Sequence, residues 1–472
     1  MKNKTNKKTG KILTAMLALL LVASMLYMTG CSVLSHKPGS GTNTNNGSNT
    51  NSGSDTAPGT MIKDGERNIY GDGVIGERKS DGGSGISGVI DGIIGRIYGG
   101  KDKAVYDSEA IVGMPEPMPG EYYDGGVVYD PGDPYGSFNG QLKPGMLTAG
   151  EVKDAKDLGN WRSLWEDENW ANIRKARGLF ADNVIKVDTL PLAKVKLLDG
   201  ETVVYEAVAD RHGNATLVYP DSYKGKVLTV KSAEFDAYEV TCEPGAKAEL
   251  TVAVDFVPAT PSNLDLMLMI DTTGSMGDEL EYLKVEIKNV IERVCSEQNI
   301  NVRLSVNFYR DEGDDYVVKY YDFRDDIDDC VRILGEQCSD GGGDYPEAVH
   351  TALGNVLQHS WREDSVKLCF FVLDAPPHDE SEIQGINSGM RKDVAAISAA
   401  GIRIIPVVSS GADLSVESLM RSFAVMTGGT YIFLTNHSGI GGDHQTPSDT
   451  QYEVEPLNDC MVRVIKEYMY AE

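Results

Sequence analysis

Basic residues are scarce in this chain of 472 residues, which has 44 lysines and arginines against 71 aspartates and glutamates. The formal net charge is −27. Such a chain repels nucleic acid and anionic lipid at long range and attracts cations. It also lacks a basic patch with interleaved aromatic residues, so we expect no nucleic-acid partner.

Familiar catalytic motifs are missing as well. The sequence contains no HExxH motif, no G-x-S-x-G elbow and no P-loop. His350 and His359 are nine residues apart, a spacing that does not place them side by side on a helix. We therefore expect a binding protein and no enzyme. A metal-dependent hydrolase is the alternative, but no acid is obviously placed to act as its base.

The first thirty-one residues have the features of an export signal. Residues 1–11 carry five lysines and no acid, and the apolar run "ILTAMLALLLVASMLYM" follows before "TGC". This order is typical of a signal peptide, although the run is also close to the length of a membrane-spanning helix. The stretch "YMTGCS" resembles a bacterial lipobox, which is cut before its cysteine. The resemblance implies a signal peptide of residues 1–30 and a lipid on Cys31, which would anchor the protein at the extracytoplasmic face of the bacterial cell membrane.

Six further cysteines leave the disulfide pattern open. In an exported chain they could form three bridges, in any of fifteen connectivities. Cys330 and Cys338 are the nearest pair. Cys369 lies in the apolar run "VKLCFFVLD", which favours a buried thiol.

Composition divides the next part of the chain in two. Residues 31–140 are rich in Gly, Ser, Asn and Pro and have too few apolar side chains to offset ordering, so we predict a flexible, disordered tether. Residues 141–184 are predicted to form a helical connector that carries three of the four tryptophans. Trp161 and Trp165 share a helix face because they are four apart. Packing of these rings onto the next domain is favoured over a carbohydrate-stacking site.

Residues 185–258 contain short alternating strands separated by turn sequences such as "DRHGN" and "PDSYKG". This pattern is typical of a small antiparallel β-sandwich. The stretch "VVYEAVADRHGNATLVYP" resembles the carboxypeptidase regulatory-like domain, which implies a spacer or adaptor module.

Residues 260–472 alternate between apolar strands and amphipathic helices, as in "LDLMLMID" followed by "GDELEYLKVEIKNVIERVCSEQ". Nearly continuous apolar strands between such helices predict an α/β fold, a doubly wound and mostly parallel sheet with helices on both faces. Ligands of such sheets bind beyond the carboxyl ends of the strands.

Oxygen-bearing side chains follow two of these strands. Asp271 ends "LMLMID", with Thr273 and Ser275 at alternate positions, and Asp374 ends "CFFVLD" in the same way. Asp344 closes the run "DGGGD", whose glycines allow a close approach of the backbone. Oxygen ligands without a Cys or His cluster select Mg²⁺, Mn²⁺ or Ca²⁺. For "DTTGS" alone a helix N-cap is the alternative, but the two further acids favour a metal.

The stretches "DTTGSM", "GGGDYPEA" and "VLDAPPH" together resemble a von Willebrand factor type A (VWA) domain with its metal-ion-dependent adhesion site (MIDAS). The resemblance covers roughly residues 260–472 and implies a Rossmann-like fold. It also implies a cation held by Asp271, Thr273, Ser275, Asp344 and Asp374. Asp344 stands where many members have threonine, which adds negative charge to the site.

The function implied is that of a lipid-anchored protein that binds a partner through its cation. The expected cofactor is Mg²⁺ (or Mn²⁺ or Ca²⁺), and the expected partner is a protein that offers a carboxylate. His378 lies four residues past Asp374, where it could contact a ligand at the rim of the site, but a solvated loop histidine is favoured. A structural cell-surface module with a purely stabilising metal is a further alternative.

Overall fold

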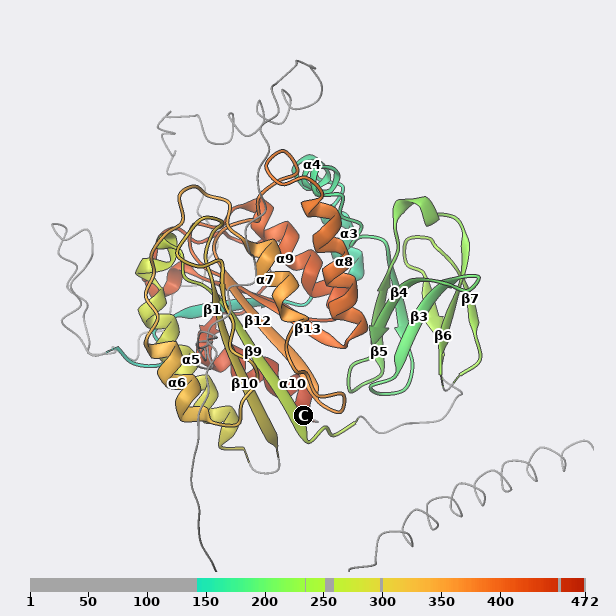
Figure 1. Ribbon diagram of the computed structural model, residues 1–472. Coiled ribbons are helices and arrows are strands. Elements are labelled where there is room, and N and C mark those ends of the chain that lie inside the picture. Colours follow the sequence, from blue (N-terminus) through green and yellow to red (C-terminus); the bar gives the residue numbers. More distant parts are fainter. Residues whose placement is uncertain (1–141, 234, 251–258, 298–299, 449–450, 471–472) are drawn as a thin grey trace, which may run out of the picture. The chain divides into compact units, whose positions relative to one another are not determined.

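The computed structural model describes residues 142–233, 235–250, 259–297, 300–448 and 451–470 (Figure 1). The predicted signal peptide, the lipidation site Cys31 and the predicted tether lie outside the described residues. In the part that is described, no helix combines the length and the apolar character needed to cross a membrane.

The core of the fold is an eight-stranded sheet with the strand order β11-β10-β9-β12-β13-β14-β1-β15. Strands β10, β9, β12, β13 and β14 are parallel, and β11 and β1 run antiparallel to their neighbours. This arrangement confirms the predicted α/β class and the mostly parallel sheet. In chain order the strands are β1 (Thr148–Val152), β9 (Asn263–Asp271), β10 (Asn301–Tyr309), β11 (Val318–Lys319), β12 (Val366–Leu373), β13 (Ile402–Val408), β14 (Tyr431–Leu434) and β15 (Glu455–Pro456).

Helices cover both faces of this sheet, as the side chains of strand β9 show by packing into a buried cluster on each face. Its leucines 264, 266 and 268 belong to a buried cluster with α5, α6 and α10, while Met267 and Met269 belong to a second cluster with α7, α8 and α9. Because successive residues of a strand point to opposite faces, an unbroken apolar run fills both cores. The helices are α5 (Leu280–Cys295), α6 (Ile327–Gly335), α7 (Val349–Val356), α8 (Ile386–Ala399), α9 (Leu414–Thr427) and α10 (Leu457–Met469).

Strand β1 joins the large sheet although it precedes β9 by more than a hundred residues. It pairs with β14 and β15, and the backbone N–H groups of Gly145, Met146 and Leu147 just before it donate to the buried carboxylate of Glu286 in α5. After β1 the chain forms α3 (Leu158–Leu164) and α4 (Glu168–Arg177). Residues predicted as a separate helical connector therefore include a strand of the large sheet.

Two small sheets lie between α4 and β9 in sequence. Their orders are β5-β2-β8 and β4-β3-β6-β7, and their side chains share one buried cluster. The prediction of a purely antiparallel sandwich is wrong in one detail, since β2 and β8 are parallel. The strands are β2 (Val184–Asp188), β3 (Lys194–Asp199), β4 (Thr202–Val208), β5 (Asn214–Val218), β6 (Val227–Ser232), β7 (Tyr238–Thr241) and β8 (Lys247–Glu249).

The sandwich is fastened to α9 by hydrogen bonds. The hydroxyl of Tyr205 donates to the carbonyl of Met426 at 2.6 Å, and that of Thr216 donates to the carbonyl of Val425 at 2.8 Å. Both hydroxyls are buried, so leaving either without its acceptor would be costly. The sandwich is therefore held against α9 by buried hydrogen bonds and is not joined to the rest of the protein by the chain alone.

The three clustered tryptophans are buried. Trp161, Trp165 and Trp170 pack edge to face, with ring centroids 5.0–5.9 Å apart. The guanidinium of Arg421 lies 5.8 Å from the Trp161 ring and 5.6 Å from the Trp170 ring. Packing, the favoured interpretation, is the one observed, and these rings offer no open platform for a sugar.

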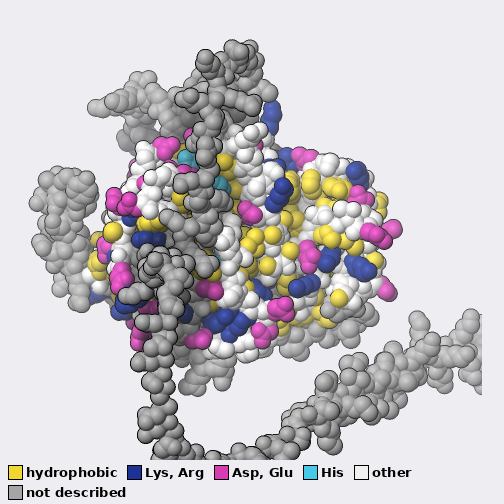
Figure 2. Space-filling view, in the orientation of Figure 1, with side chains coloured by type: hydrophobic (Ala, Val, Ile, Leu, Met, Phe, Trp, Pro, Cys, Tyr) yellow, Lys and Arg dark blue, Asp and Glu magenta, His cyan; other side chains and the backbone are white. Residues whose placement is uncertain are grey.

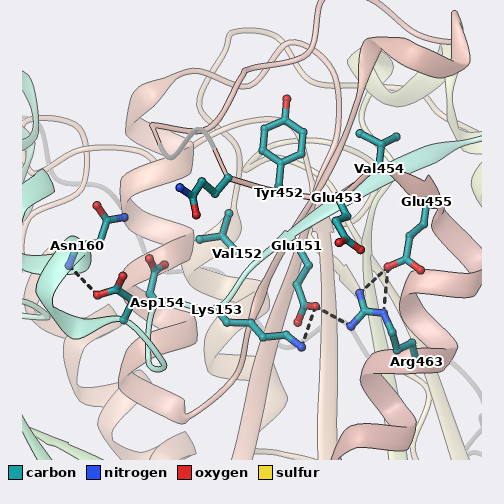
Figure 3. Close-up of a pocket in the computed structure, with 12 residues that line it drawn as sticks. Glu151, Val152, Lys153, Asp154, Asn160, Tyr452, Glu453, Val454, Glu455 and Arg463 are labelled. Carbon is teal, nitrogen blue, oxygen red and sulfur yellow. Dashed lines mark hydrogen bonds and ion pairs between the residues drawn. The ribbon is translucent and has the colours of Figure 1, made fainter. Parts of the chain in front are cut away.

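A cavity of about 760 Å³ lies beside strand β1 (Figure 3). Its charged side chains are largely paired with one another, as Arg463 is with Glu151 and Glu455 and Lys153 is with Glu151. None of the residues predicted for the metal site lines it.

All six cysteines downstream of Cys31 are free thiols in the described structure. Cys330 and Cys369 are buried and Cys338 is exposed. Burial raises the pKa of Cys330 to about 12, so this thiol is held in its neutral, unreactive form.

Candidate metal centre

The carboxyl end of β9 brings three oxygen-bearing side chains together. The Thr273 hydroxyl donates to Asp271 Oδ1 at 2.7 Å and lies 3.2 Å from the hydroxyl of Ser275. Asp271 and Thr273 have no exposed surface. The alternation Asp-x-Thr-x-Ser therefore directs three oxygens toward one small region, as the sequence predicts.

These groups do not act as an ordinary helix cap. Helix α5 begins only at Leu280, after the short 3₁₀ segment η2 (Gly274–Asp278), and neither N-cap residue makes a side-chain capping bond. Asp271 does accept the N–H of Thr273 through Oδ1, but its Oδ2 is buried without a hydrogen-bond partner. Half of the carboxylate is thus left for another ligand.

Parallel register brings the second predicted acid to the same edge. Val372 of β12 pairs with Ile270 of β9, so Asp374 leaves its strand beside Asp271. Asp374 is 3% exposed, and its Oδ1 also lacks a hydrogen-bond partner. Burial raises the pKa of Asp374, and the nearby charge of Asp271 adds to the rise.

The glycine run approaches this edge closely. The N–H of Gly274 donates to the carbonyl of Gly341, and the N–H of Asp340 donates to the carbonyl of Thr272. Gly342 has a φ of +69°, and a Cβ there would lie 2.8 Å from Glu347 Oε1 and 3.1 Å from Thr273 Cβ. Only glycine combines this backbone conformation with this approach.

Glu347, which is not among the predicted ligands, is the third buried acid of the candidate centre. Its backbone N–H donates to the carbonyl of Pro376 at 2.9 Å, which fixes it against the loop that follows Asp374. It is 2% exposed, and its Oε2 lacks a hydrogen-bond partner. Because it follows Pro346, just before α7, its sequence position suggests no more than a favourable charge in the first turn of a helix.

Burial and, after it, neighbouring charges raise the pKa values of the three acids. Burial raises the pKa of Glu347 to about 9, and the charges of Asp271, Asp311 and Asp374 add to the rise. Burial also raises the pKa of Asp271 and of Asp374 above the ordinary range for aspartate. Within one site, like charges and desolvation disfavour the ionised forms.

A divalent cation fits this arrangement. Asp271 Oδ2, Asp374 Oδ1 and Glu347 Oε2 are buried oxygens without hydrogen-bond partners in the described structure, and each belongs to a carboxyl group. Buried polar groups are nearly always satisfied, and carboxylates crowded together without a cation are unfavourable. Carboxylate and hydroxyl oxygens are the donors that Mg²⁺, Mn²⁺ and Ca²⁺ accept.

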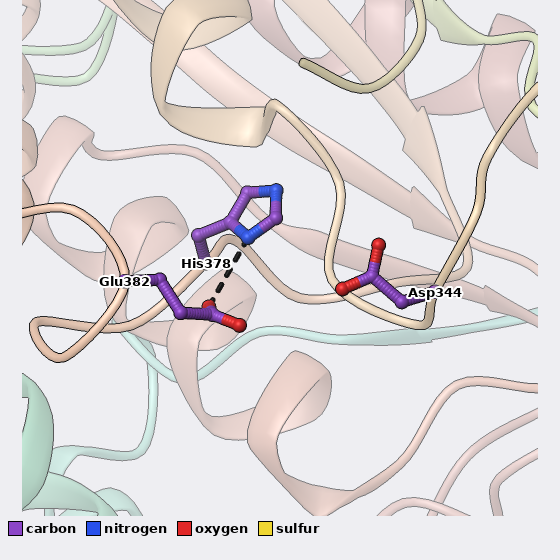
Figure 4. A group of neighbouring side chains, drawn as sticks. All are labelled: Asp344, His378 and Glu382. Atoms are coloured by element: carbon purple, nitrogen blue, oxygen red, sulfur yellow. Dashed lines mark hydrogen bonds and ion pairs between the residues drawn. The ribbon is translucent and has the colours of Figure 1, made fainter. Parts of the chain in front are cut away.

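Asp344, the remaining predicted ligand, lies in a different group. It is exposed, and its carboxylate lies with ligand atoms of His378 and Glu382, all within 4.8 Å of one another (Figure 4). His378 is 8% exposed, so it is not a solvated loop residue. Its ring nitrogens are hydrogen-bonded to Asp311 and Glu382.

The acidic run at residues 310–315, in the loop that follows β10, also supports the centre. Asp314 accepts the N–H of Gly342 at 3.0 Å, and Arg310 donates to the carbonyl of Thr272 at 3.1 Å. Asp311 is 6% exposed and is hydrogen-bonded to His378. Four loops are thus bound to one another at the carboxyl edge of the sheet.

The comparison with protein families agrees with this geometry. Residues 265–436 match the family model described as von Willebrand factor A domain. The matched region contains the ends of β9 and β12 and the glycine run, and so all five predicted ligands. The match supports a protein-interaction or adhesion module at these residues, and VWA domains often bind a divalent metal.

Two curated proteins are similar to part of the chain. An ariadne-like RING finger protein, R811, of Acanthamoeba polyphaga mimivirus is 26% identical over 187 residues, which are 36% of this chain and 18% of that protein. The alpha-protein kinase vwkA of Dictyostelium discoideum is 27% identical over 120 residues, 24% of this chain and 19% of the kinase. The chain thus spans less than a fifth of either relative, and the similarity concerns one region of each.

Proposed function

We propose that this chain is a membrane-anchored, extracytoplasmic protein that binds a protein partner through a divalent cation, Mg²⁺ or else Mn²⁺ or Ca²⁺, held by its VWA region as a MIDAS. The observation that carries the proposal is the set of three buried carboxylates, Asp271, Glu347 and Asp374, each with an unpartnered oxygen. A divalent cation at this point would relieve their mutual repulsion and let all three carboxylates ionise.

The residues would divide the work as follows. The carboxylates of Asp271, Glu347 and Asp374 would supply negative charge. The hydroxyls of Thr273 and Ser275 would supply the further oxygen ligands on the protein side of the cation's coordination shell. Asp344, the fifth ligand in the prediction, would act from the exposed rim. A bound cation of this kind supplies an open coordination position for an oxygen, such as the carboxylate of a partner.

Metal and partner binding can be tested with the full chain. We expect Mg²⁺ or Mn²⁺ to raise the melting temperature, and Asp271→Ala to abolish that rise because the cation loses its central ligand. We expect the same surface proteins to be captured by the wild type and lost both with a chelator and with Asp271→Ala. Glu363→Ala is the matched control. It removes an exposed acid that lies just before the first residue of β12, whereas Asp374 follows the last residue of that strand.

Two results would contradict the proposal. If the melting temperature does not respond to divalent metal, the carboxylates do not form a metal site. If metal binds but capture is indifferent to chelator and to Asp271→Ala, the metal only stabilises the fold and the adhesion function is wrong. Metal-dependent turnover of peptide or ester substrates would favour the hydrolase instead.

The anchor needs its own experiment, because it concerns residues outside the described structure. Cys31→Ser removes the thiol to which the lipid would be attached. In a bacterial host, we expect the wild type in the membrane fraction and labelled by a fatty-acid analogue. We expect the variant to keep its signal peptide and to remain unlabelled. Equal lipid labelling of both proteins would exclude Cys31 as the lipidation site.

The remaining partner classes are less well supported. Acidic and basic side chains are intermingled over the visible face, together with clusters of apolar side chains (Figure 2). An intermingled surface on a chain of net charge −27 does not favour nucleic acid. We therefore propose a protein partner.

A further inference from the structure

Asp344, His378 and Glu382 form a cluster of possible metal ligands distinct from the three buried acids (Figure 4). One ligand atom of each lies within 4.8 Å of the others. Asp344 comes from the glycine run, whereas His378 and Glu382 come from the loop between β12 and α8. The cluster does not depend on the proposed adhesion function, because it contains none of the residues at the end of β9.

The imidazole ring of His378 is oriented by a buried carboxylate. Its Nε2 lies 2.7 Å from Asp311 Oδ1, and its Nδ1 lies 3.1 Å from Glu382 Oε2. Asp311 is 6% exposed and lies on another loop, the one that follows β10. When Nε2 carries the proton, it donates a hydrogen bond to Asp311. The lone pair of Nδ1 is then directed toward Glu382. A carboxylate that takes the second N–H of a histidine is the usual support of a metal-binding imidazole.

The backbone around His378 is fixed as well. Arg177 of α4 donates to the carbonyls of His378 and Pro377, at 2.6 and 2.9 Å. The N–H of Asp379 donates to Glu382 Oε2 at 3.1 Å, which holds that carboxylate against the ring. Preorganised ligands of this kind lose little freedom when they bind a cation.

The donor set differs in kind from that of the buried acids. One imidazole nitrogen and two carboxylates suit borderline transition ions, whereas an all-oxygen set suits Mg²⁺ or Ca²⁺. Three protein ligands also leave a position for water or for a further ligand. We infer that Asp344, His378 and Glu382 bind a second cation, a transition ion such as Zn²⁺, beside the all-oxygen centre.

The inference assigns Asp344 a different role from the one that the family resemblance implies. Glu347 already gives the inner centre a third carboxylate, so that centre does not need Asp344. Asp344 is then free to bridge the glycine run to the loop that carries His378. Two adjacent cations of different chemistry would then hold the glycine run and the loop between β12 and α8 together at the carboxyl edge of the sheet.

Zinc titration of the full chain in excess Mg²⁺ tests this inference, since Mg²⁺ occupies the all-oxygen centre and competes poorly for imidazole. All proteins carry Cys338→Ser, which removes an exposed thiol that could itself bind zinc. We expect one zinc equivalent by calorimetry. His378→Gln should weaken binding about a hundredfold, and the supporting variant Asp311→Asn about tenfold.

The controls separate this site from the first one. Asp271→Ala and His437→Gln, an exposed histidine of η3 (Asn436–Ser438), should leave zinc affinity unchanged. Because His378→Gln could disturb a buried position, the exposed Glu382→Gln serves as a second ligand variant. Unchanged zinc affinity in both ligand variants, or loss of zinc in Asp271→Ala alone, would overturn the inference. The adhesion proposal would survive that result, since it depends on Asp271.

Discussion

Glu347→Gln is expected to raise the melting temperature of the metal-free protein at pH 8, by roughly 5 °C for a change of one to two kcal/mol. Glu347 has a pKa of about 9, so without a cation the folded protein at pH 8 must either take up a proton at this buried carboxyl or hold it ionised beside Asp271 and Asp374. Glutamine has the same shape, removes one charge and can donate to the unpartnered oxygens of its neighbours. The same variant should lose most of the stabilisation by Mg²⁺, because it lacks one of the proposed ligands.

The pH dependence follows from the direction of the shift. Folding raises the pKa of Glu347 from 4.5 to about 9, so the folded protein holds a proton that the unfolded chain releases between these values. The stabilising contribution is complete below pH 4.5 and is lost as the pH rises toward 9. Thermal unfolding from pH 5 to 9 should therefore show a growing gap between the melting temperatures with and without Mg²⁺.

The control for this experiment is Glu363→Gln, which removes the same charge from an exposed position. It should change neither the metal-free melting temperature nor the response to Mg²⁺. If Glu347→Gln destabilises the metal-free protein at every pH, repulsion among these acids does not dominate the centre. In that case the cation would not be needed to relieve it.

Arg421→Met should cost about 3–5 kcal/mol of folding free energy, the typical effect of breaking a buried ion pair. The guanidinium has no exposed surface and donates to both oxygens of Asp154, at 2.6 and 2.9 Å, and to Glu417 at 2.8 Å. Methionine fills part of the volume but leaves two buried carboxylates without their cation. The loss can be measured by denaturant unfolding, with Arg421→Lys as a second variant.

Lysine should rescue little of this loss, because an ammonium group cannot reproduce the paired bonds to Asp154. Arg332→Met is the matched control, since Arg332 pairs with Asp329 and Glu336 but its side chain is 57% exposed. Exposed pairs contribute about 0–1 kcal/mol, so the control should be nearly neutral. Equal effects of the two methionine variants would mean that Asp154 and Glu417 find other partners.

The sequence predicts the α/β fold and the meeting of Asp271 and Asp374 at the candidate metal centre for a common reason. Apolar strands such as "LMLMID" and "CFFVLD" are recognisable by themselves, and parallel pairing brings their last residues to one edge. Asp271 and Asp374 could thus be placed together without knowing the loops.

What the sequence does not reveal depends on loops and on distant pairing. Glu347 ends no strand, and only the path of the glycine run brings it to the centre. The sequence around His378 favours a solvated loop histidine, because Asp311, which orients the ring, is 67 residues away. Strand β1, "TAGEV", is short and contains a glycine, so its pattern is weak, and its partners lie near the other end of the chain.

The late pairing of β1 has a consequence for how the protein is made. The hydroxyls of Thr148 and Thr435 are 2.7 Å apart in the folded protein but 287 positions apart in the chain. A growing polypeptide exposes β1 early and must wait for β14 and β15 before this side of the sheet can close. Loops of such length close slowly, and an unpaired strand invites association with other chains. We therefore expect shortened translation products that end before residue 431 to aggregate, even though they contain the ends of β9 and β12.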